Sequence, residues 1–333
     1  MAARSSSPKL DSIDLELIRE LENDGRQTRL EIATALGISE RTLRRRLQHL
    51  LDERVIRIQA IAGPLPLQSK MMAMLGINVL RGKINSVSDT LGSYKSVIGA
   101  TIVAGRYDIL ASILCGQPDE LWEFVTDELG KIQGVVGAEV MPVLRMFKNS
   151  YAVLAENYPL PELKACNWSA DHFDVALIRE LEQDGSQSYA ALAQKLGLSK
   201  ATILKRMNSL FENQVIRVVA VANPYTLGYG TSALILVKAP PSRVKTVAEE
   251  LASFPETQII AATAGPYDLT GWVVFKDTDS LSDFVRTELD NIAGITSHET
   301  LLNLQFGKLQ TNLASKLVSV NDKSAEQPGL SVL

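Results

Sequence analysis

A cluster of arginines, with one glutamine, lies between residues 40 and 57 and is the strongest candidate for a binding site in this sequence. Six arginines stand there against three acidic residues, in a chain whose net charge is −4. Arginine displaces counterions from phosphates, and arginine or glutamine can bond base edges in the major groove of DNA. The cluster therefore predicts contact with nucleic acid. A basic face that is merely solvated is the alternative.

The residues of this cluster have the period of an amphipathic helix from Glu40 to Asp52. Four leucines fall on one arc of that helix, and the polar side chains occupy the opposite face and its flanks. The residues expected to reach DNA from this helix and its first turn are Ser39, Arg41, Thr42, Arg44, Arg45, Arg46, Gln48 and His49.

Two further helical segments precede it, one through Ile18 and Leu21 and one from about Arg29 to Leu36. Between the second and third helices, Gly37 ends one helix and Ser39 can cap the next with its hydroxyl. Short helices joined by a glycine turn are typical of the helix-turn-helix motif. A helical hairpin used only for packing is the alternative.

The helical segments belong to a longer stretch of sequence that occurs twice in the chain. Residues 12–150 repeat at 172–310 with a constant shift of 160 and no gap, beginning DLELIRELENDG and DVALIRELEQDG. A period this long exceeds that of a solenoid unit, so it indicates two copies of a complete module, a dimer within one polypeptide. The second helix that should reach DNA has different side chains, which predicts a different half-site. Its candidates are Ser199, Lys200, Ala201, Thr202, Lys205, Arg206, Asn208 and Ser209.

The remainder of each repeat changes period and predicts the order βαββαβ, the split-βαβ ferredoxin-like plan. Such a sheet carries helices on one face, and we expect the sister sheet to cover the other. In the first copy the expected elements are strands 71–79, 97–104, 109–114 and 136–146 and helices 84–92 and 119–129. In the second they are strands 232–238, 258–264, 269–275 and 295–304 and helices 242–253 and 279–291.

The fold class is thus α+β, with two winged-helix-like helix-turn-helix domains alternating with two ferredoxin-like βαββαβ domains. The expected boundaries are 10–64 and 170–224 for the DNA-binding domains, 65–151 and 225–315 for the others, 152–169 for a linker and 316–333 for a flexible tail.

These motifs together resemble the Lrp/AsnC (feast/famine) transcription regulators. They comprise Leu-Gly-[Ile/Leu]-Ser before a basic helix, Val-Ile-Arg leading into a strand, and Gly-x-Tyr-Asp between the second and third strands of βαββαβ. The resemblance covers nearly all of both repeats. It implies DNA-binding domains joined to effector (RAM-like) domains that dimerise through their sheets and, in larger assemblies, sense amino acids or similar molecules. This chain departs from the family by fusing two subunits.

The expected effector-binding residues follow from that resemblance and from the polar run that the second copy carries after its last helix. An ordinary packing or turn role, or plain exposure to solvent, is the alternative for each. They are Gly265, Tyr267, Asp268, Thr296, Ser297 and Thr300, with Gly105, Tyr107 and Asp108 in the first copy.

Other functions find little support in the sequence. Cys115 and Cys166 occupy non-equivalent positions, so we expect neither metal nor disulfide, and no glycine-rich phosphate loop follows a strand. We expect no cofactor, no catalytic residue, no membrane span and a cytoplasmic location. The expected partners are double-stranded DNA, a small-molecule effector and further copies of the fused chain. A siroheme decarboxylase-like enzyme, which has the same two-domain plan, is the alternative function.

Overall fold

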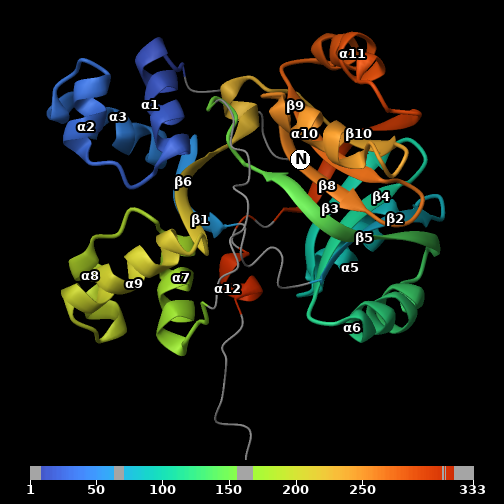
Figure 1. The fold of residues 1–333 in the computed structure, drawn as a ribbon, viewed down its shortest axis with the longest axis horizontal. Coiled ribbons are helices and arrows are strands. Elements are labelled where there is room, and N and C mark those ends of the chain that lie inside the picture. Colours follow the sequence, from blue (N-terminus) through green and yellow to red (C-terminus); the bar gives the residue numbers. More distant parts are fainter. Residues whose placement is uncertain (1–8, 64–70, 156–167, 310, 312, 319–333) are drawn as a thin grey trace, which may run out of the picture.

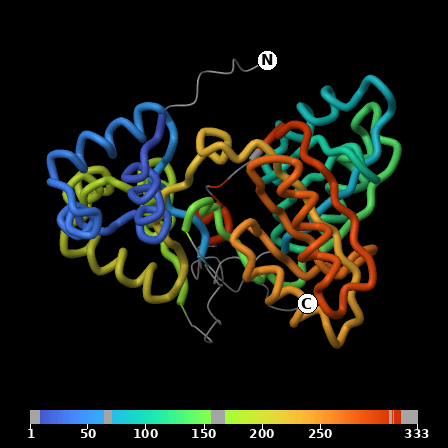
Figure 2. The backbone as a smooth tube through the Cα atoms, turned by 90° about the horizontal axis from the view of Figure 1, so that it is seen from above, coloured from blue at the N-terminus to red at the C-terminus, as the bar shows by residue number. Residues whose placement is uncertain are grey.

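The computed structural model describes residues 9–63, 71–155, 168–309, 311 and 313–318. Most of the expected linker at 152–169 and of the expected tail at 316–333 lies outside the described residues. The chain forms two lobes, a pair of helical units and a β-barrel, which Figure 2 shows side by side.

Each helical unit contains the three helices that the sequence predicts. They are α1 (Ser12–Asn23), α2 (Arg29–Ala35) and α3 (Glu40–Asp52), and α7 (His172–Gln183), α8 (Tyr189–Leu196) and α9 (Lys200–Glu212). All six begin at a residue whose side chain accepts a hydrogen bond from the first turn, which satisfies an otherwise unpaired backbone N–H.

The two helical units interlock. Strand β1 (Ile56–Ala62) pairs antiparallel with β6 (Ile216–Ala222), and the first helix of each unit packs on the strand of the other. The Gly25 amide donates to the Val218 carbonyl at 2.9 Å, and the Gly185 amide donates to the Ile58 carbonyl at 2.8 Å. One continuous apolar core runs through both units. Figure 1 shows this two-stranded sheet between the two helix groups.

The remaining strands close into one eight-stranded barrel. The first copy contributes β2 (Met71–Val79), β3 (Val97–Ala104), β4 (Ile109–Cys115) and β5 (Val135–Asn149). The second contributes β7 (Thr231–Lys238), β8 (Thr257–Thr263), β9 (Leu269–Phe275) and β10 (Ser297–Leu309). Around the barrel the order is β10-β3-β4-β2-β5-β8-β9-β7, so each copy supplies four consecutive strands.

Pairing between copies closes the barrel at two equivalent seams. Val143 of β5 lies opposite Thr263 of β8, and Asn303 of β10 lies opposite Val103 of β3. These pairs are related by the shift of 160, so the two halves share a pseudo-two-fold axis. The expectation that the two effector domains meet within one chain is confirmed. β5 and β10 run past their predicted ends at 146 and 304 because their last residues pair with strands of the other copy.

Helices cover the outer face of the barrel. α5 (Ile84–Ser93) and α6 (Pro118–Glu123) pack on the first half-sheet, and α10 (Val244–Ser253) and α11 (Thr278–Thr287) on the second (Figure 1). The helix predicted at 119–129 is shorter, because its backbone changes to π-helix at Phe124–Glu128 and then to 3-10 helix. α12 (Ala314–Leu317) packs on α7 and β1, between the two lobes. Among the described segments, no helix combines the length and apolar character needed to cross a bilayer.

Candidate DNA interface and effector surface

The third helix of the first unit presents a basic face to solvent. On its core side, Leu43 and Leu50 are fully buried. Ser39 caps the helix through the Thr42 amide at 3.1 Å. The predicted DNA-facing residues that the structure leaves exposed are Ser39, Arg41, Arg44, Arg45, Gln48 and His49. Gln48 donates to Asp52 on the same face at 2.8 Å. Figure 1 shows α2, α3, α8 and α9 on the side remote from the barrel.

The equivalent face of α9 is less basic. Lys200, Ala201, Lys205 and Asn208 are exposed there. Leu204, at the position of Arg44, is 43% exposed and apolar. Ser199 and Thr202 form the same cap as in the first unit, with a 3.0 Å bond from the Thr202 amide to the Ser199 hydroxyl. The two faces therefore present different hydrogen-bonding groups to solvent.

Arg46 and Arg206, both predicted to contact DNA, point instead into their own units. The Arg46 guanidinium meets Asp11 at 2.8 Å and Asp14 at 2.7 Å, and Arg206 repeats this with Asp171 and Asp174. The backbone N–H of Asp14 and the Arg46 guanidinium hold the pKa of Asp11 below its usual value. These arginines tie the third helix of each unit to its first helix, so their structural role is to position the third helix.

Ser209 is a second departure from the expected DNA-facing set. Its hydroxyl accepts a hydrogen bond from the Trp168 indole N–H at 3.2 Å, so it is turned toward the start of the second unit. Its counterpart His49 is exposed. The helical period alone could not separate these cases, because the partner Trp168 lies 41 residues away in sequence.

The two Gly-x-Tyr-Asp turns lie against the opposite copy. A side chain on Gly105 would collide with Leu301 of β10, and one on Gly265 would come within 3.0 Å of the Val140 carbonyl. Both glycines have positive φ angles, 150° and 114°. Asp108 accepts the Val79 amide at 2.7 Å and Asp268 accepts the Ala239 amide at 2.9 Å. Both turns therefore fasten the end of a neighbouring strand.

The tyrosines of these turns are buried beside a charged group that the predicted site residues did not include. Tyr107 donates to Glu139 at 2.6 Å. Arg106 pairs with Glu139 at 2.7 Å and lies 3.9 Å from Glu299, so one arginine faces the equivalent glutamates of both copies. Burial and the Glu299 carboxylate raise the pKa of Tyr267 to about 12. The signal in the sequence was that Glu139 and Glu299 are equivalent positions of the repeat.

The structure brings only part of the expected effector set together. Thr296 donates its hydroxyl to the Lys238 carbonyl at 3.1 Å, next to the Ala239 amide that binds Asp268. Thr296 and Ser297 are exposed there. Thr300 pairs with Ile235, three positions before Lys238 on β7, and its hydroxyl oxygen is buried. Asp268, Thr296 and Ser297 thus form an open polar surface that Thr300 does not join.

Comparisons with known proteins agree with both halves of this architecture. The model of the Lrp/AsnC ligand binding domain matches residues 72–153 and again 232–312. The AsnC-type helix-turn-helix domain matches 171–210, and a winged helix-turn-helix DNA-binding model matches 10–57.

Individual relatives match about one repeat. An uncharacterized HTH-type transcriptional regulator of Pyrococcus horikoshii is 37% identical over 131 residues, which are 39% of this chain and 83% of the relative. The HTH-type transcriptional regulator FL11 of the same organism is 33% identical over 42% of this chain and 93% of its own length. The crystal structure of the siroheme decarboxylase NirDL matches 92% of this chain and 98% of its own, with a TM-score of 0.63 and 13% identity, a likeness of fold.

Proposed function

The chain belongs to the Lrp/AsnC family of DNA-binding transcription regulators, and we propose that it reads an asymmetric operator whose two half-sites are bound by α3 and α9. The observation that carries this proposal is that the exposed faces of α3 and α9 carry different side chains, although the two helical units share one core. The first offers Arg41, Arg44 and Arg45, and the second offers Lys200 and Lys205. Arginine favours bidentate contact with guanine, whereas lysine is a point charge.

The interlocked core supports a fixed spacing between the half-sites. Because α1 packs on β6 and α7 packs on β1, neither helical unit can move without disturbing the core of the other. A fixed separation of recognition helices requires a matching separation of half-sites along the duplex. We therefore expect two different half-sites in a defined order, bound by one chain in the cytoplasm.

We further propose that DNA binding responds to a small polar effector, an amino acid or a relative of one. Support comes from the open surface of Asp268, Thr296 and Ser297, where a carboxylate stands beside two hydroxyls. Such groups can pair an ammonium and bond a carboxylate. An open surface becomes a pocket when another molecule covers it, so we propose that a second copy of the fused chain completes the site.

A siroheme decarboxylase is the other candidate on this fold, and we do not propose it. The likeness to NirDL rests on 13% identity. The turns Gly105–Asp108 and Gly265–Asp268 contain no histidine, and the exposed face of α3 is suited to phosphates. A visible spectrum after incubation with siroheme tests this choice, because a stable Soret shift would favour the enzyme.

The proposed DNA-binding function is tested by selecting the sequences that the full chain binds from random duplex DNA, and then footprinting the enriched site. We expect an operator with two dissimilar halves and affinity at least about 10³-fold above that for random DNA at physiological salt. A perfectly palindromic operator, or equal affinity for all sequences, would contradict the proposal.

A further inference from the structure

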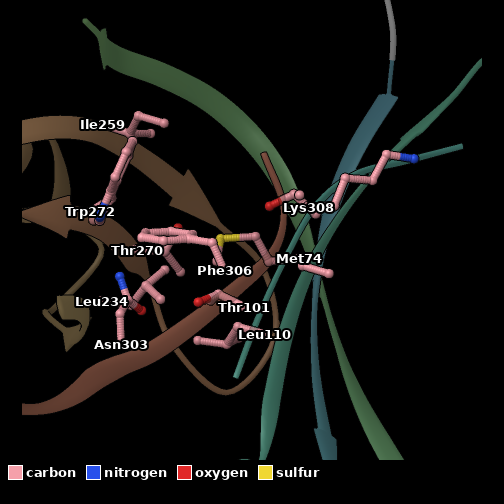
Figure 3. Close-up of a pocket in the computed structure, with 14 residues that line it drawn as sticks. Met74, Thr101, Leu110, Leu234, Ile259, Thr270, Trp272, Asn303, Phe306 and Lys308 are labelled. Atoms are coloured by element: carbon pink, nitrogen blue, oxygen red, sulfur yellow. The ribbon is translucent and has the colours of Figure 1, made fainter. Parts of the chain in front are cut away.

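A cavity of about 110 Å³ lies inside the barrel, between the two half-sheets. Figure 3 shows its lining. Large apolar side chains from both copies form most of the wall, chiefly Met74, Leu110, Leu234, Ile259, Trp272 and Phe306. Trp272 and Phe306 meet edge to face, with ring centroids 5.8 Å apart. The cavity is separate from the surface of Asp268 and Thr296, because none of its lining residues belongs to that surface.

The cavity exists because the two copies differ. Gly99 and Ser112 of the first copy line it, and their equivalents in the second copy are Ile259 and Trp272. The small residues leave open on one side of the pseudo-two-fold axis the volume that larger side chains occupy on the other. An added Cβ at Gly99 would come no closer than 3.7 Å to Ser112, so the space accepts a larger group without a clash.

Two polar atoms in the wall have no partner in the part of the chain that the structure describes. The indole nitrogen of Trp272 and the side-chain oxygen of Asn303 are both buried and unbonded. Asn303 donates its NH2 group to the Ser232 hydroxyl at 2.8 Å, and the oxygen of the same amide has no partner there. A buried donor or acceptor without a partner destabilises the fold, so a donor and an acceptor are both available here for a ligand.

The cavity does not present a positive charge to a ligand. Lys308 lines it, but Figure 3 shows its ammonium pointing away from Trp272 and Phe306. That ammonium donates to the Tyr94 carbonyl at 2.8 Å. An anion buried beside Trp272 would therefore lack a counter-charge, which disfavours it strongly.

We propose that this cavity binds a small neutral molecule with an apolar body and one hydroxyl or carboxamide group. The cavity is smaller than the apolar cavity of about 150 Å³ that holds benzene, so the ligand is no larger than a single ring with its polar group. A single hydroxyl accepts from the Trp272 N–H and donates to Asn303 Oδ1. The ligand is thus distinct in class from the charged amino acid proposed for the outer surface.

The position of Trp272 links this cavity to the DNA-binding lobe. Its ring also packs against the cluster of Ile61, Tyr151 and Val219, in which Ile61 lies on β1 and Val219 on β6. A ligand that moves or fixes the Trp272 ring acts on the strands that hold the two recognition helices together. This step rests on the proposed DNA-binding function, whereas the binding itself does not.

Binding is tested on the full chain without DNA, with phenol as the probe and toluene as its match without a hydroxyl. We expect phenol, at up to about 10 mM, to raise the melting temperature more than toluene does, by mass action on the folded state. Trp272→Phe and Asn303→Leu should each reduce the advantage of phenol over toluene. Trp122→Phe, at a side chain that is 70% exposed, is the control and should leave it unchanged.

Filling the cavity gives the decisive comparison. Gly99→Ile and Ser112→Leu introduce bulk and should abolish the phenol shift, and Gly99→Ala serves where a larger substitution prevents folding. Equal phenol stabilisation in wild type and in folded filled variants, or no shift in wild type, overturns the site. If phenol binds but operator affinity is unchanged, the site stands and the link through Trp272 is wrong. If the chain binds no operator at all but still binds phenol, the proposed function fails and the cavity site does not.

Discussion

Gln59 of β1 lies directly opposite Val219 of β6, and the two occupy equivalent positions of the repeat. The pseudo-two-fold axis therefore passes between them. Their contacts with the barrel lobe differ in kind. Gln59 donates its amide to the Thr311 hydroxyl, whereas Val219 packs on Tyr151, the equivalent of Thr311. The equivalent junctions on the two sides of the axis are therefore a hydrogen-bonded pair at Gln59 and an apolar contact at Val219.

The first prediction concerns this junction. Gln59 is 4% exposed, so Thr311→Val should leave its amide buried without this partner and destabilise the chain by about 1–3 kcal/mol. Gln59→Val in the same background should recover part of that loss, since both polar partners are then gone. Urea unfolding of the two single variants and the double variant gives the coupling free energy. If the changes in the free energy of unfolding of the two single variants add up to that of the double variant, the Gln59–Thr311 hydrogen bond contributes no coupling free energy.

The second prediction concerns the side chains of α3 and α9 that we expect to contact bases. Arg45→Ala should weaken operator binding by about 1–3 kcal/mol and relax sequence preference in one half-site, because it removes a base-edge contact. Lys205→Ala should act on the other half-site. Gel-shift titration against operators with each half scrambled gives the assignment. If Arg45→Ala changed neither operator nor random-DNA affinity, α3 would not be a recognition helix.

The third prediction concerns Arg46, whose guanidinium is held by two carboxylates within its own unit. Arg46→Ala should lower the free energy of unfolding by about 1.5–3 kcal/mol, because charge-assisted hydrogen bonds to Asp11 and Asp14 are lost. Arg44→Ala, on the exposed face, is the matched control. It should change stability by less than about 0.5 kcal/mol and lower DNA affinity instead. Loss of stability in the control alone would reverse the two assignments.

The fourth prediction is a pH dependence. Burial lowers the pKa of Lys148 to about 8 from 10.5, and its ammonium donates to the Phe254 carbonyl at 2.9 Å. Below pH 8 both folded and unfolded chains carry the charge. Between about 8 and 10.5 the unfolded chain binds more protons, so this residue makes the free energy of unfolding rise with pH in that window.

Lys148→Met should remove that rise, which is measured as the difference between variant and wild type in urea unfolding at several pH values. Lys308→Met is the matched control at the equivalent position, where the ammonium donates to the Tyr94 carbonyl and the residue is less buried. We expect a smaller change there. An identical pH profile in wild type and Lys148→Met would show that this lysine keeps its ordinary pKa.

The sequence predicted the local elements well because their causes are local. The cap at Ser39 and the strand Met71–Val79 each depend on a few neighbouring residues, and both appear as expected. What depended on contacts between copies was not predictable. The extra length of β5 and β10 comes from the barrel seams, and Ser209 is turned by Trp168. The cavity was not predicted either, because its shape depends on how side chains of both copies meet, including Gly99 and Ser112 and their equivalents Ile259 and Trp272.

The last prediction places amino-acid sensing in the second copy. Asp268 binds the Ala239 amide through Oδ2, and we expect its other oxygen to meet an ammonium while Thr296 and Ser297 bond the polar end of the ligand. A thermal-shift screen over amino acids should yield a hit that Asp268→Asn and Thr296→Val both weaken. Asp108→Asn is the matched control, since Asp108 holds the Val79 amide in the same way but has no equivalent hydroxyl pair beside it. A hit that survives the first two changes and is lost in the control would place the working pocket in the first copy.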